Sequence, residues 1–180
     1  TPCVTVCWDE KGRLSSIYDK KCGREVLKEG CFGNVLELYE DKPLGDDAWN
    51  IDSFYTEKRK ELSMDREARV TELGALRMKL EFVYHFHRSS IRQEMVLYRD
   101  CARIDFCTRV DWREEHKLLK TAFYTDVRAV KAAYDIQFGY IERPTHRNTS
   151  WDRAKFEVCG HKWADLSESD YGVSLLNDCK

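Results

Sequence analysis

The chain contains 180 residues, of which 42% are hydrophobic and 12% aromatic, and its formal net charge is −2. This composition is typical of a globular domain with a substantial core, and it excludes a disordered chain. The near-zero charge argues against nucleic acid or an anionic membrane surface as a partner, since both attract basic proteins. No apolar run reaches the roughly 20 residues of a membrane-spanning helix. We therefore expect a soluble domain that contacts neither a membrane nor nucleic acid.

The eight cysteines give a further guide to the class of protein. None is spaced as Cys-x-x-Cys, so a structural zinc site of that type is not indicated. Cys101 and Cys107 flank Ile104 and Phe106, and we predict that they fill buried positions of a strand. The even count permits disulfides, but a domain of this length does not need them. We therefore favour free thiols in a reducing compartment.

Both ends of the sequence fall close to β patterns. Thr1 is followed almost at once by an alternating run at residues 3–8, and Lys180 comes soon after the strand-like residues 172–176. A natural chain seldom stops in the middle of a β pattern, because that leaves an unpaired strand edge. We expect this chain to be a piece of a longer polypeptide.

Alternation of apolar and polar residues predicts strands along most of the chain. The clearest case is residues 76–86, where the even positions are apolar and the odd ones mostly polar. His85 and His87 fall at odd positions. We interpret them as solvated histidines on a sheet face, because two histidines without a third partner make a poor metal site. The expected strands lie at residues 3–8, 14–18, 25–27, 34–40, 68–73, 76–87, 90–98, 102–112, 118–124, 132–138 and 172–176.

Many strands with short connections and no convincing helix predict an all-β fold. We expect one domain over residues 1–180, a large antiparallel β-sandwich in which two sheets pack face to face. Residues 41–52 interrupt the pattern with turn-forming residues and carboxylates. We predict a long loop there.

That loop is the first of three clusters that could carry chemistry. It contains Asp46, Asp47, Trp49 and Asp52. A carboxylate beside an exposed tryptophan suits a sugar site, because the ring stacks on the apolar face of a pyranose while the carboxylate accepts hydrogen bonds from hydroxyls. The alternative is a loop held by a buried tryptophan, with aspartates that bond their own backbone as turn formers. Both interpretations stay open.

The second cluster lies around Arg143 and Pro144. A proline restricts the residue before it, so we predict an extended turn that presents Glu142, His146 and Asn148 near one another. Glu142 and His146 could act as an acid/base pair. The residues alone favour a polar corner in which Arg143 and Glu142 pair structurally, since half-buried charges need partners.

The third cluster covers residues 161–168, where Lys162, Trp163 and Asp165 alternate along an expected strand. Packing is the favoured interpretation. The sequence contains no glycine-rich phosphate loop, no Gly-x-Ser-x-Gly elbow and no His-Glu-x-x-His. Nothing in it assembles a complete catalytic centre, and we expect no catalytic residue and no metal ligand in this chain.

Taken together, the three clusters resemble the C-terminal half of glycoside hydrolase family 38 α-mannosidases, most closely the cytosolic and vacuolar type found also in bacteria and archaea. The resemblance covers nearly the whole chain, including residues 12–20 and 24–27. The motifs that carry it are Asp41-Lys42-Pro43, Asp47-Ala48-Trp49-Asn50-Ile51-Asp52, Glu142-Arg143-Pro144-Thr145-His146, Asn148-Thr149-Ser150-Trp151-Asp152, Phe156-Glu157-Val158, and the runs at residues 161–168 and 171–178.

The resemblance implies a β super-sandwich similar to galactose-mutarotase-like domains. It also implies that an N-terminal β/α barrel, absent from this sequence, supplies the nucleophile, the general acid and most ligands of a divalent metal, usually zinc. The mechanism would be retaining, with two carboxyl groups about 5 Å apart in that barrel. The isolated chain should then be inactive on mannose-containing oligosaccharides.

In such enzymes the β-domain packs on the barrel and lends side chains to the rim of the sugar pocket. The polar and aromatic loop residues that we assign to this rim are Asp47, Trp49, Asp52, Arg143, His146 and Trp151. The resemblance implies a cytoplasmic enzyme, or a vacuolar one in a eukaryote, and allows an oligomeric one. The alternatives are a free-standing carbohydrate-binding module and a purely structural interaction domain.

Overall fold

The computed structural model describes residues 1–47 and 49–178. The chain divides into two compact units, Thr1–Tyr124 and Thr125–Lys180, and each is described by itself. Nearly all regular structure in both units is β, and every strand pairing between described residues is antiparallel. The all-β antiparallel prediction is confirmed, whereas the single domain over residues 1–180 stays a prediction. None of the helices in the described part is long and apolar enough to cross a membrane.

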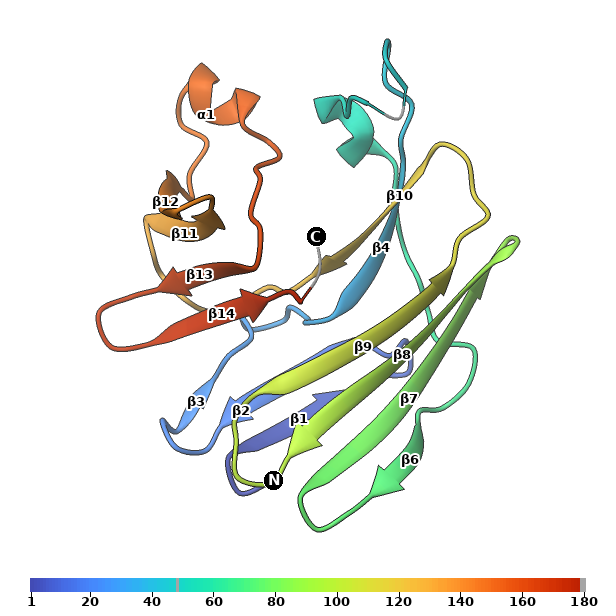
Figure 1. The fold of residues 1–180 in the computed structure, drawn as a ribbon, viewed down its shortest axis with the longest axis vertical. Coiled ribbons are helices and arrows are strands. Elements are labelled where there is room, and N and C mark those ends of the chain that lie inside the picture. Colours follow the sequence, from blue (N-terminus) through green and yellow to red (C-terminus); the bar gives the residue numbers. More distant parts are fainter. Residues whose placement is uncertain (48, 179–180) are drawn as a thin grey trace. The chain divides into compact units, whose positions relative to one another are not determined.

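In the described part of the first unit, the strands form three sheets with the orders β1-β2-β3, β10-β4-β5 and β6-β7-β8-β9 (Figure 1). Short turns join most neighbours, as the sequence predicted. The elements are β1 (Val4–Trp8), β2 (Leu14–Asp19), β3 (Arg24–Glu25), β4 (Val35–Glu40), the 3-10 helix η1 (Ser53–Glu57), β5 (Arg59–Glu61), β6 (Arg69–Leu73), β7 (Arg77–Phe86), β8 (Ser89–Tyr98), β9 (Ile104–Asp111) and β10 (Lys117–Ala122).

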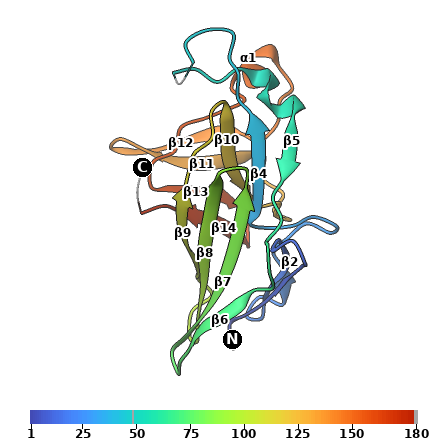
Figure 2. The same ribbon diagram turned by 90° about the vertical axis from the view of Figure 1, so that its right-hand side faces the viewer.

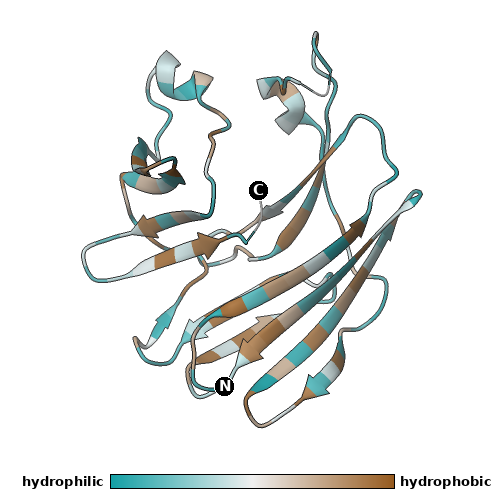
Figure 3. Ribbon diagram, in the orientation of Figure 1, coloured by the Kyte–Doolittle hydropathy of each residue, from teal (hydrophilic) through white to brown (hydrophobic). Residues whose placement is uncertain are grey.

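The hairpin of β7 and β8 carries the core of this unit. Its pairing runs without interruption from Arg77 opposite Tyr98 to Phe86 opposite Ser89. Apolar and polar residues alternate along it (Figure 3), and the apolar face is buried. That face forms one hydrophobic cluster with the sheet of β1, β2 and β3, so these two sheets make a sandwich. The residues that join them are Val4, Leu14, Ile17, Leu27, Leu80, Phe82, Tyr84, Phe86, Ile91, Met95 and Leu97.

β4 is buried on both faces, unlike the half-buried strand that its alternating sequence suggests. It lies between β10 and β5 (Figure 2). Five consecutive residues from Val35 to Tyr39 are buried, including the charged Glu37. A buried carboxylate needs hydrogen-bonding partners.

The second unit contains a four-stranded sheet in the order β12-β11-β13-β14. Its elements are β11 (Lys131–Ile136), β12 (Gly139–Pro144), the short helix α1 (Ser150–Ala154), β13 (Trp163–Ser167) and β14 (Gly172–Leu176). The strands expected near residues 132–138, 161–168 and 172–176 are confirmed.

Several local predictions are wrong. The extended turn expected around Arg143 is a strand, β12, and two short helices form where none was expected. Cys101 and Cys107 are exposed rather than buried. Successive residues of a strand point to opposite faces, and since Phe106 takes the inner side of β9, Cys107 must face outward. His85 is exposed on the outer face as predicted, but His87 lies in the turn after β7 with a φ of 47°.

Candidate functional site

The loop between β4 and η1 exposes its tryptophan. Trp49 is 91% exposed, so the alternative of a buried tryptophan that holds the loop is wrong. The loop is shaped by Asp46, whose φ is 55° and whose carbonyl accepts hydrogen bonds from the backbone N–H groups of Trp49 at 2.9 Å and Asn50 at 3.0 Å. Asparagine and aspartate tolerate this left-handed conformation better than most residues. The tight turn leaves the indole ring pointing away from the core.

Asp47 and Asp52 have different roles within this loop. The Asp52 carboxylate accepts a hydrogen bond from the backbone N–H of Leu44 at 2.7 Å and so closes the loop as a turn former. The Asp47 carboxylate, which is mostly exposed, lies 3.3 Å from the ring nitrogen Nδ1 of His116. Asp47 and Trp49 are therefore the exposed members of the cluster, and Asp47 lies beside the ionisable side chain of His116.

His116 was not singled out from the sequence. The pairing of Lys117 with Glu40 joins β10 to β4 and brings the His116 carbonyl within 2.9 Å of the Asp41 backbone N–H. These strands are far apart in the chain, and no local pattern around His116 signals that they pair. Only the sheet order places this imidazole beside the loop.

Arg143 projects from β12 and holds a neighbouring loop. Its Nη1 donates a hydrogen bond to the Cys159 carbonyl at 2.7 Å, and its guanidinium lies 5.0 Å from the centre of the Tyr134 ring. The predicted pairing with Glu142 is wrong, since Glu142 bonds the ammonium of Lys131 at 2.8 Å. The reason is the strand itself, which sends the side chains of adjacent residues to opposite faces.

The helix α1 carries Trp151, and its Asp152 contacts His146. Thr149 and Asp152 form a capping box in which the Thr149 hydroxyl accepts from the Asp152 backbone and the Asp152 carboxylate accepts from the Thr149 backbone. The Thr149 hydroxyl also donates to this carboxylate, and these bonds hold the pKa of Asp152 below its usual value. His146 Nδ1 lies 3.6 Å from the same carboxylate, so Asp152 rather than Glu142 is its acidic partner. Trp151 is 78% exposed.

Each unit thus contains an exposed tryptophan and, one or two residues away in the sequence, an aspartate. In both units the carboxylate of this aspartate contacts a histidine. In the first unit the three residues are Trp49, Asp47 and His116. In the second they are Trp151, Asp152 and His146. A ring that can stack beside groups that accept or donate hydrogen bonds suits a hydroxyl-rich ligand.

A third surface lies on one face of the sheet in the second unit. A hollow of about 400 Å³ is lined by Ala133, Tyr140, Trp163, Asp165, Ser174 and Leu176. The rings of Tyr140 and Trp163 are 6.2 Å apart and tilted by 42°. The Asp165 carboxylate accepts hydrogen bonds from the hydroxyls of Ser167 at 2.7 Å and Ser174 at 2.5 Å. The sequence favours packing for Trp163 and Asp165, and only the strand register brings Tyr140 onto the same face.

No metal centre can be built from these residues. Across residues 1–47 and 49–178, no three His, Cys, Asp or Glu side chains are grouped so that they could hold a metal ion. The His–Asp contacts described above are pairs, and a zinc site needs at least three protein ligands. Within the described residues, these pairs alone therefore do not make a zinc site.

Comparison with known proteins agrees with the resemblance noted in the sequence. The family model described as "Glycosyl hydrolases family 38 C-terminal domain" matches residues 1–180. Alpha-mannosidase G of Dictyostelium discoideum is 44% identical over 183 residues, and alpha-mannosidase 2C1 of Homo sapiens is 44% identical over 179 residues. Each alignment covers 98% of this chain but 17% of the relative, so the chain spans a small part of the length of these relatives.

A more distant relative and a solved structure extend the comparison. Alpha-mannosidase of Saccharomyces cerevisiae is 35% identical over 190 residues, which cover 98% of this chain and 18% of the yeast protein. The crystal structure of an alpha-mannosidase from Enterococcus faecalis superposes with a TM-score of 0.76 over 99% of this chain and 23% of that chain. Its sequence identity is 13%, so it supports the fold alone. By the family match along its whole length, the chain belongs to glycosyl hydrolase family 38, in which it corresponds to the C-terminal domain.

Proposed function

We propose that the chain works as part of a retaining α-mannosidase that releases terminal α-linked mannose from oligosaccharides. Its role there is to support the catalytic barrel and to border the sugar pocket. The observation that carries this proposal is the family match over residues 1–180 to a domain of α-mannosidases. The nucleophile, the general acid and the divalent metal, which the family resemblance implies to be zinc, would belong to the barrel. The isolated chain is then expected to be inactive.

The proposed rim consists of six residues that fall into two groups. Trp49 and Trp151 would stack on sugar rings, while Asp47 and His146 would bond sugar hydroxyls, since these four side chains are exposed. Asp52 and Arg143 would position the rim, because their polar atoms already bind the backbone of Leu44 and Cys159.

The proposed compartment is the cytoplasm. Seven described cysteines are free, among them the exposed Cys7, Cys22, Cys101, Cys107 and Cys159. Exposed thiols persist in a reducing compartment, whereas oxidising compartments favour disulfides. A membrane or nucleic-acid partner is not part of the proposal, and the assembly of the whole enzyme into oligomers is compatible with it.

The rim assignment can be tested in the full-length enzyme. Trp49→Ala and Trp151→Ala should each lower kcat/KM for a mannose-containing oligosaccharide roughly tenfold, which corresponds to about 1.4 kcal/mol of transition-state stabilisation. Phe138→Ala is the matched control, because Phe138 is a fully exposed aromatic residue in the turn between β11 and β12. Equal kcat/KM values in all three variants and the parent enzyme would exclude both tryptophans from the rim.

A second candidate is a carbohydrate-binding surface, which the hollow beside Tyr140, Trp163 and Asp165 favours. Two neighbouring rings and a carboxylate form a platform that suits a pyranose. Isothermal titration of the chain with mannose and mannobiose tests it. Saturation at millimolar concentrations or below, lost in Trp163→Ala but not in Trp49→Ala, would support a binding module.

A further inference from the structure

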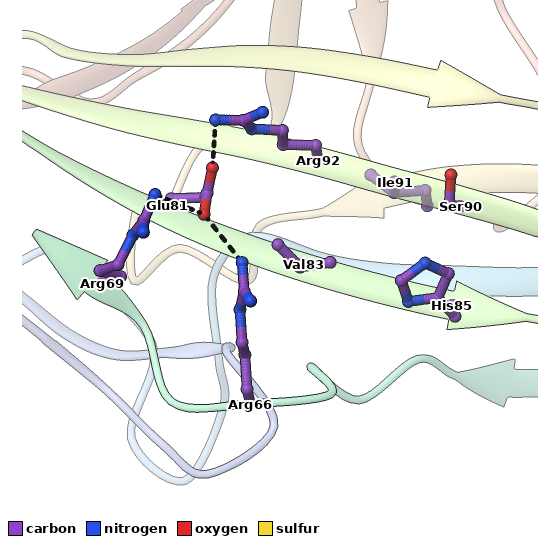
Figure 4. Close-up of a pocket in the computed structure, with 8 residues that line it drawn as sticks. All are labelled: Arg66, Arg69, Glu81, Val83, His85, Ser90, Ile91 and Arg92. Atoms are coloured by element: carbon purple, nitrogen blue, oxygen red, sulfur yellow. Dashed lines mark hydrogen bonds and ion pairs between the residues drawn. The ribbon is translucent and has the colours of Figure 1, made fainter. Parts of the chain in front are cut away.

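Three arginines surround one buried carboxylate on the outer face of the sheet of β6, β7, β8 and β9 (Figure 4). Glu81 lies in the middle of β7, and its side chain is only 2% exposed. The Nη2 atoms of Arg66 and Arg69 lie 3.1 Å and 3.6 Å from Glu81 Oε1, and that of Arg92 lies 2.5 Å from Oε2. The arginine side chains themselves are between 57% and 65% exposed.

The charges in this cluster do not balance. Three guanidinium groups face a single carboxylate, which leaves an excess of two positive charges. On the same face Glu94 lies opposite Glu81 and Arg109 lies opposite Arg92, so the neighbouring positions add one charge of each sign. Asp65 adds a further carboxylate beside the hollow, where it lies 2.7 Å from His85 Nδ1.

The arginines retain donors for a further ligand. In the described contacts each one reaches Glu81 through one terminal nitrogen, although a guanidinium carries five N–H donors. A hollow of about 330 Å³ opens between them and continues past Val83 and Ile91 to His85 and Ser90, which face each other across β7 and β8. The free donors and the excess charge therefore border the same space.

The framework of this hollow is fixed in advance. Arg69 pairs directly with Glu81 across β6 and β7, and Arg92 lies on β8 beside them. Arg66 follows Asp65, whose backbone N–H bonds the Val83 carbonyl at 2.9 Å. Glu81 gives the three guanidinium groups a common anchor, so a ligand would meet them already oriented.

We propose that this hollow binds a dianionic oxyanion, either free phosphate or the phosphate group of a small monoester. Arg66, Arg69 and Arg92 would donate to its oxygens, because planar guanidinium groups match the geometry of phosphate and bind it in a bidentate manner. His85 and Ser90 border the remainder of the ligand. Three guanidinium groups share the single carboxylate of Glu81, and this local arrangement favours an anionic ligand.

The experiment is isothermal titration of the full-length enzyme, at constant ionic strength, with inorganic phosphate and separately with mannose 6-phosphate as a monoester. Saturable binding of either probe is expected, with chloride as the blank. Stronger binding of the monoester would identify a monoester ligand, and equal binding would identify the phosphate group alone. Absence of saturable binding by both would overturn the proposal and leave the cluster as a structural ion-pair network.

Variants separate a local site from general electrostatic attraction. Arg92→Gln and Arg66→Gln should each weaken phosphate binding roughly tenfold or more, because each removes charge-assisted hydrogen bonds. Arg109→Gln removes the same charge from the same face but outside the hollow, and it should weaken binding clearly less than either of the other variants, because it removes no hydrogen bond to the ligand. Arg66 lies outside the strands, so Arg66→Gln should not disturb the sheet. This variant can therefore still be measured if Arg92→Gln proves unstable. An equal loss in Arg109→Gln would refute the site.

Discussion

The hydroxyl of Tyr39 donates a hydrogen bond to the carboxylate of Glu37 at 2.5 Å, and both residues lie on the same side of β4. The Tyr124 hydroxyl donates to the other carboxylate oxygen at 3.0 Å, and Arg59 Nη2 lies 2.5 Å from that same oxygen. Burial, and then the bond to Glu37, raise the pKa of Tyr39 far above its usual value. The carboxylate of Glu37, a residue that is only 3% exposed, is thus bound by one guanidinium group and two phenol hydroxyls.

Glu37→Gln is predicted to destabilise the protein by about 2 kcal/mol, because the neutral amide keeps the side-chain shape but replaces an acceptor oxygen of the charged carboxylate with a donor, so that charge-assisted hydrogen bonds are lost. Chemical denaturation measures the change. Glu29→Gln, at an exposed position, is the control and should alter the free energy of unfolding by less than about 0.5 kcal/mol. Similar values for the two variants would contradict a stabilising role for the Glu37 network.

Glu25 is predicted to make stability depend on pH in the acid range. Burial alone would raise its pKa, but hydrogen bonds from the Ser16 hydroxyl and the backbone N–H groups of Ile17 and Leu27 outweigh that effect and lower it from 4.5. Because the folded-state pKa is lowered, this stabilisation is present above pH 4.5 and is lost as pH falls through the folded-state pKa.

Unfolding of the parent and of Glu25→Gln, measured at neutral pH and at several values below pH 4.5, tests this assignment. The parent should lose more stability than the variant over the acid range, because the variant has no proton to bind at this position. Parallel pH profiles would show that Glu25 is not linked to folding.

Gly12→Ala is predicted to be far more costly than Gly30→Ala. Both glycines have positive φ, 82° and 70°, so either alanine costs about 1 kcal/mol in backbone conformation. A Cβ at Gly12 would also lie 2.5 Å from the Tyr84 hydroxyl oxygen, whereas one at Gly30 would meet nothing within 4 Å. Overpacking should bring the Gly12 variant to about 3 kcal/mol. Thermal and chemical denaturation of both variants measures the difference, and equal losses would contradict the contact.

Thr149→Ala is predicted to lower activity through α1 in the full-length enzyme. The substitution removes both side-chain bonds that Thr149 makes to Asp152 and should unwind the five-residue helix that carries Trp151. If Trp151 borders the sugar pocket, kcat/KM should fall severalfold with little change in global stability, since no residue of α1 is buried. Thr149→Ser retains the capping hydroxyl and should keep activity near that of the parent. Loss of activity in both variants would assign the effect to something other than the cap.

The sequence predicted the strands that have one buried face and one exposed face. In β7 the alternation of apolar and polar residues matches the burial of Leu80, Phe82, Tyr84 and Phe86. β12 gave no such signal, because five of its six residues are exposed. α1 has no buried residue and hence no helical periodicity, and the spacing of Thr149 and Asp152 as a capping box is its one local signal.

The sequence predicted which loops carry the candidate site, but it did not predict which side chains contact one another there. The closing role of Asp52 follows from local turn chemistry, whereas the sequence left the exposure of Trp49 open. The contact of Asp47 with His116 depends on the pairing of β4 with β10, which lie far apart in the sequence. Arg143 bonds the Cys159 carbonyl instead of Glu142 for a similar reason, since strand register and not sequence proximity decides its partner.

The exposed cysteines also provide a chemical probe of the second unit. Arg143 fixes the backbone of Cys159 through its carbonyl, while the Cys159 side chain remains exposed. A maleimide that reacts with this thiol would therefore report on the mobility of the loop that Arg143 holds. The same exposure means that purification without a reductant would join copies of the protein through intermolecular disulfides.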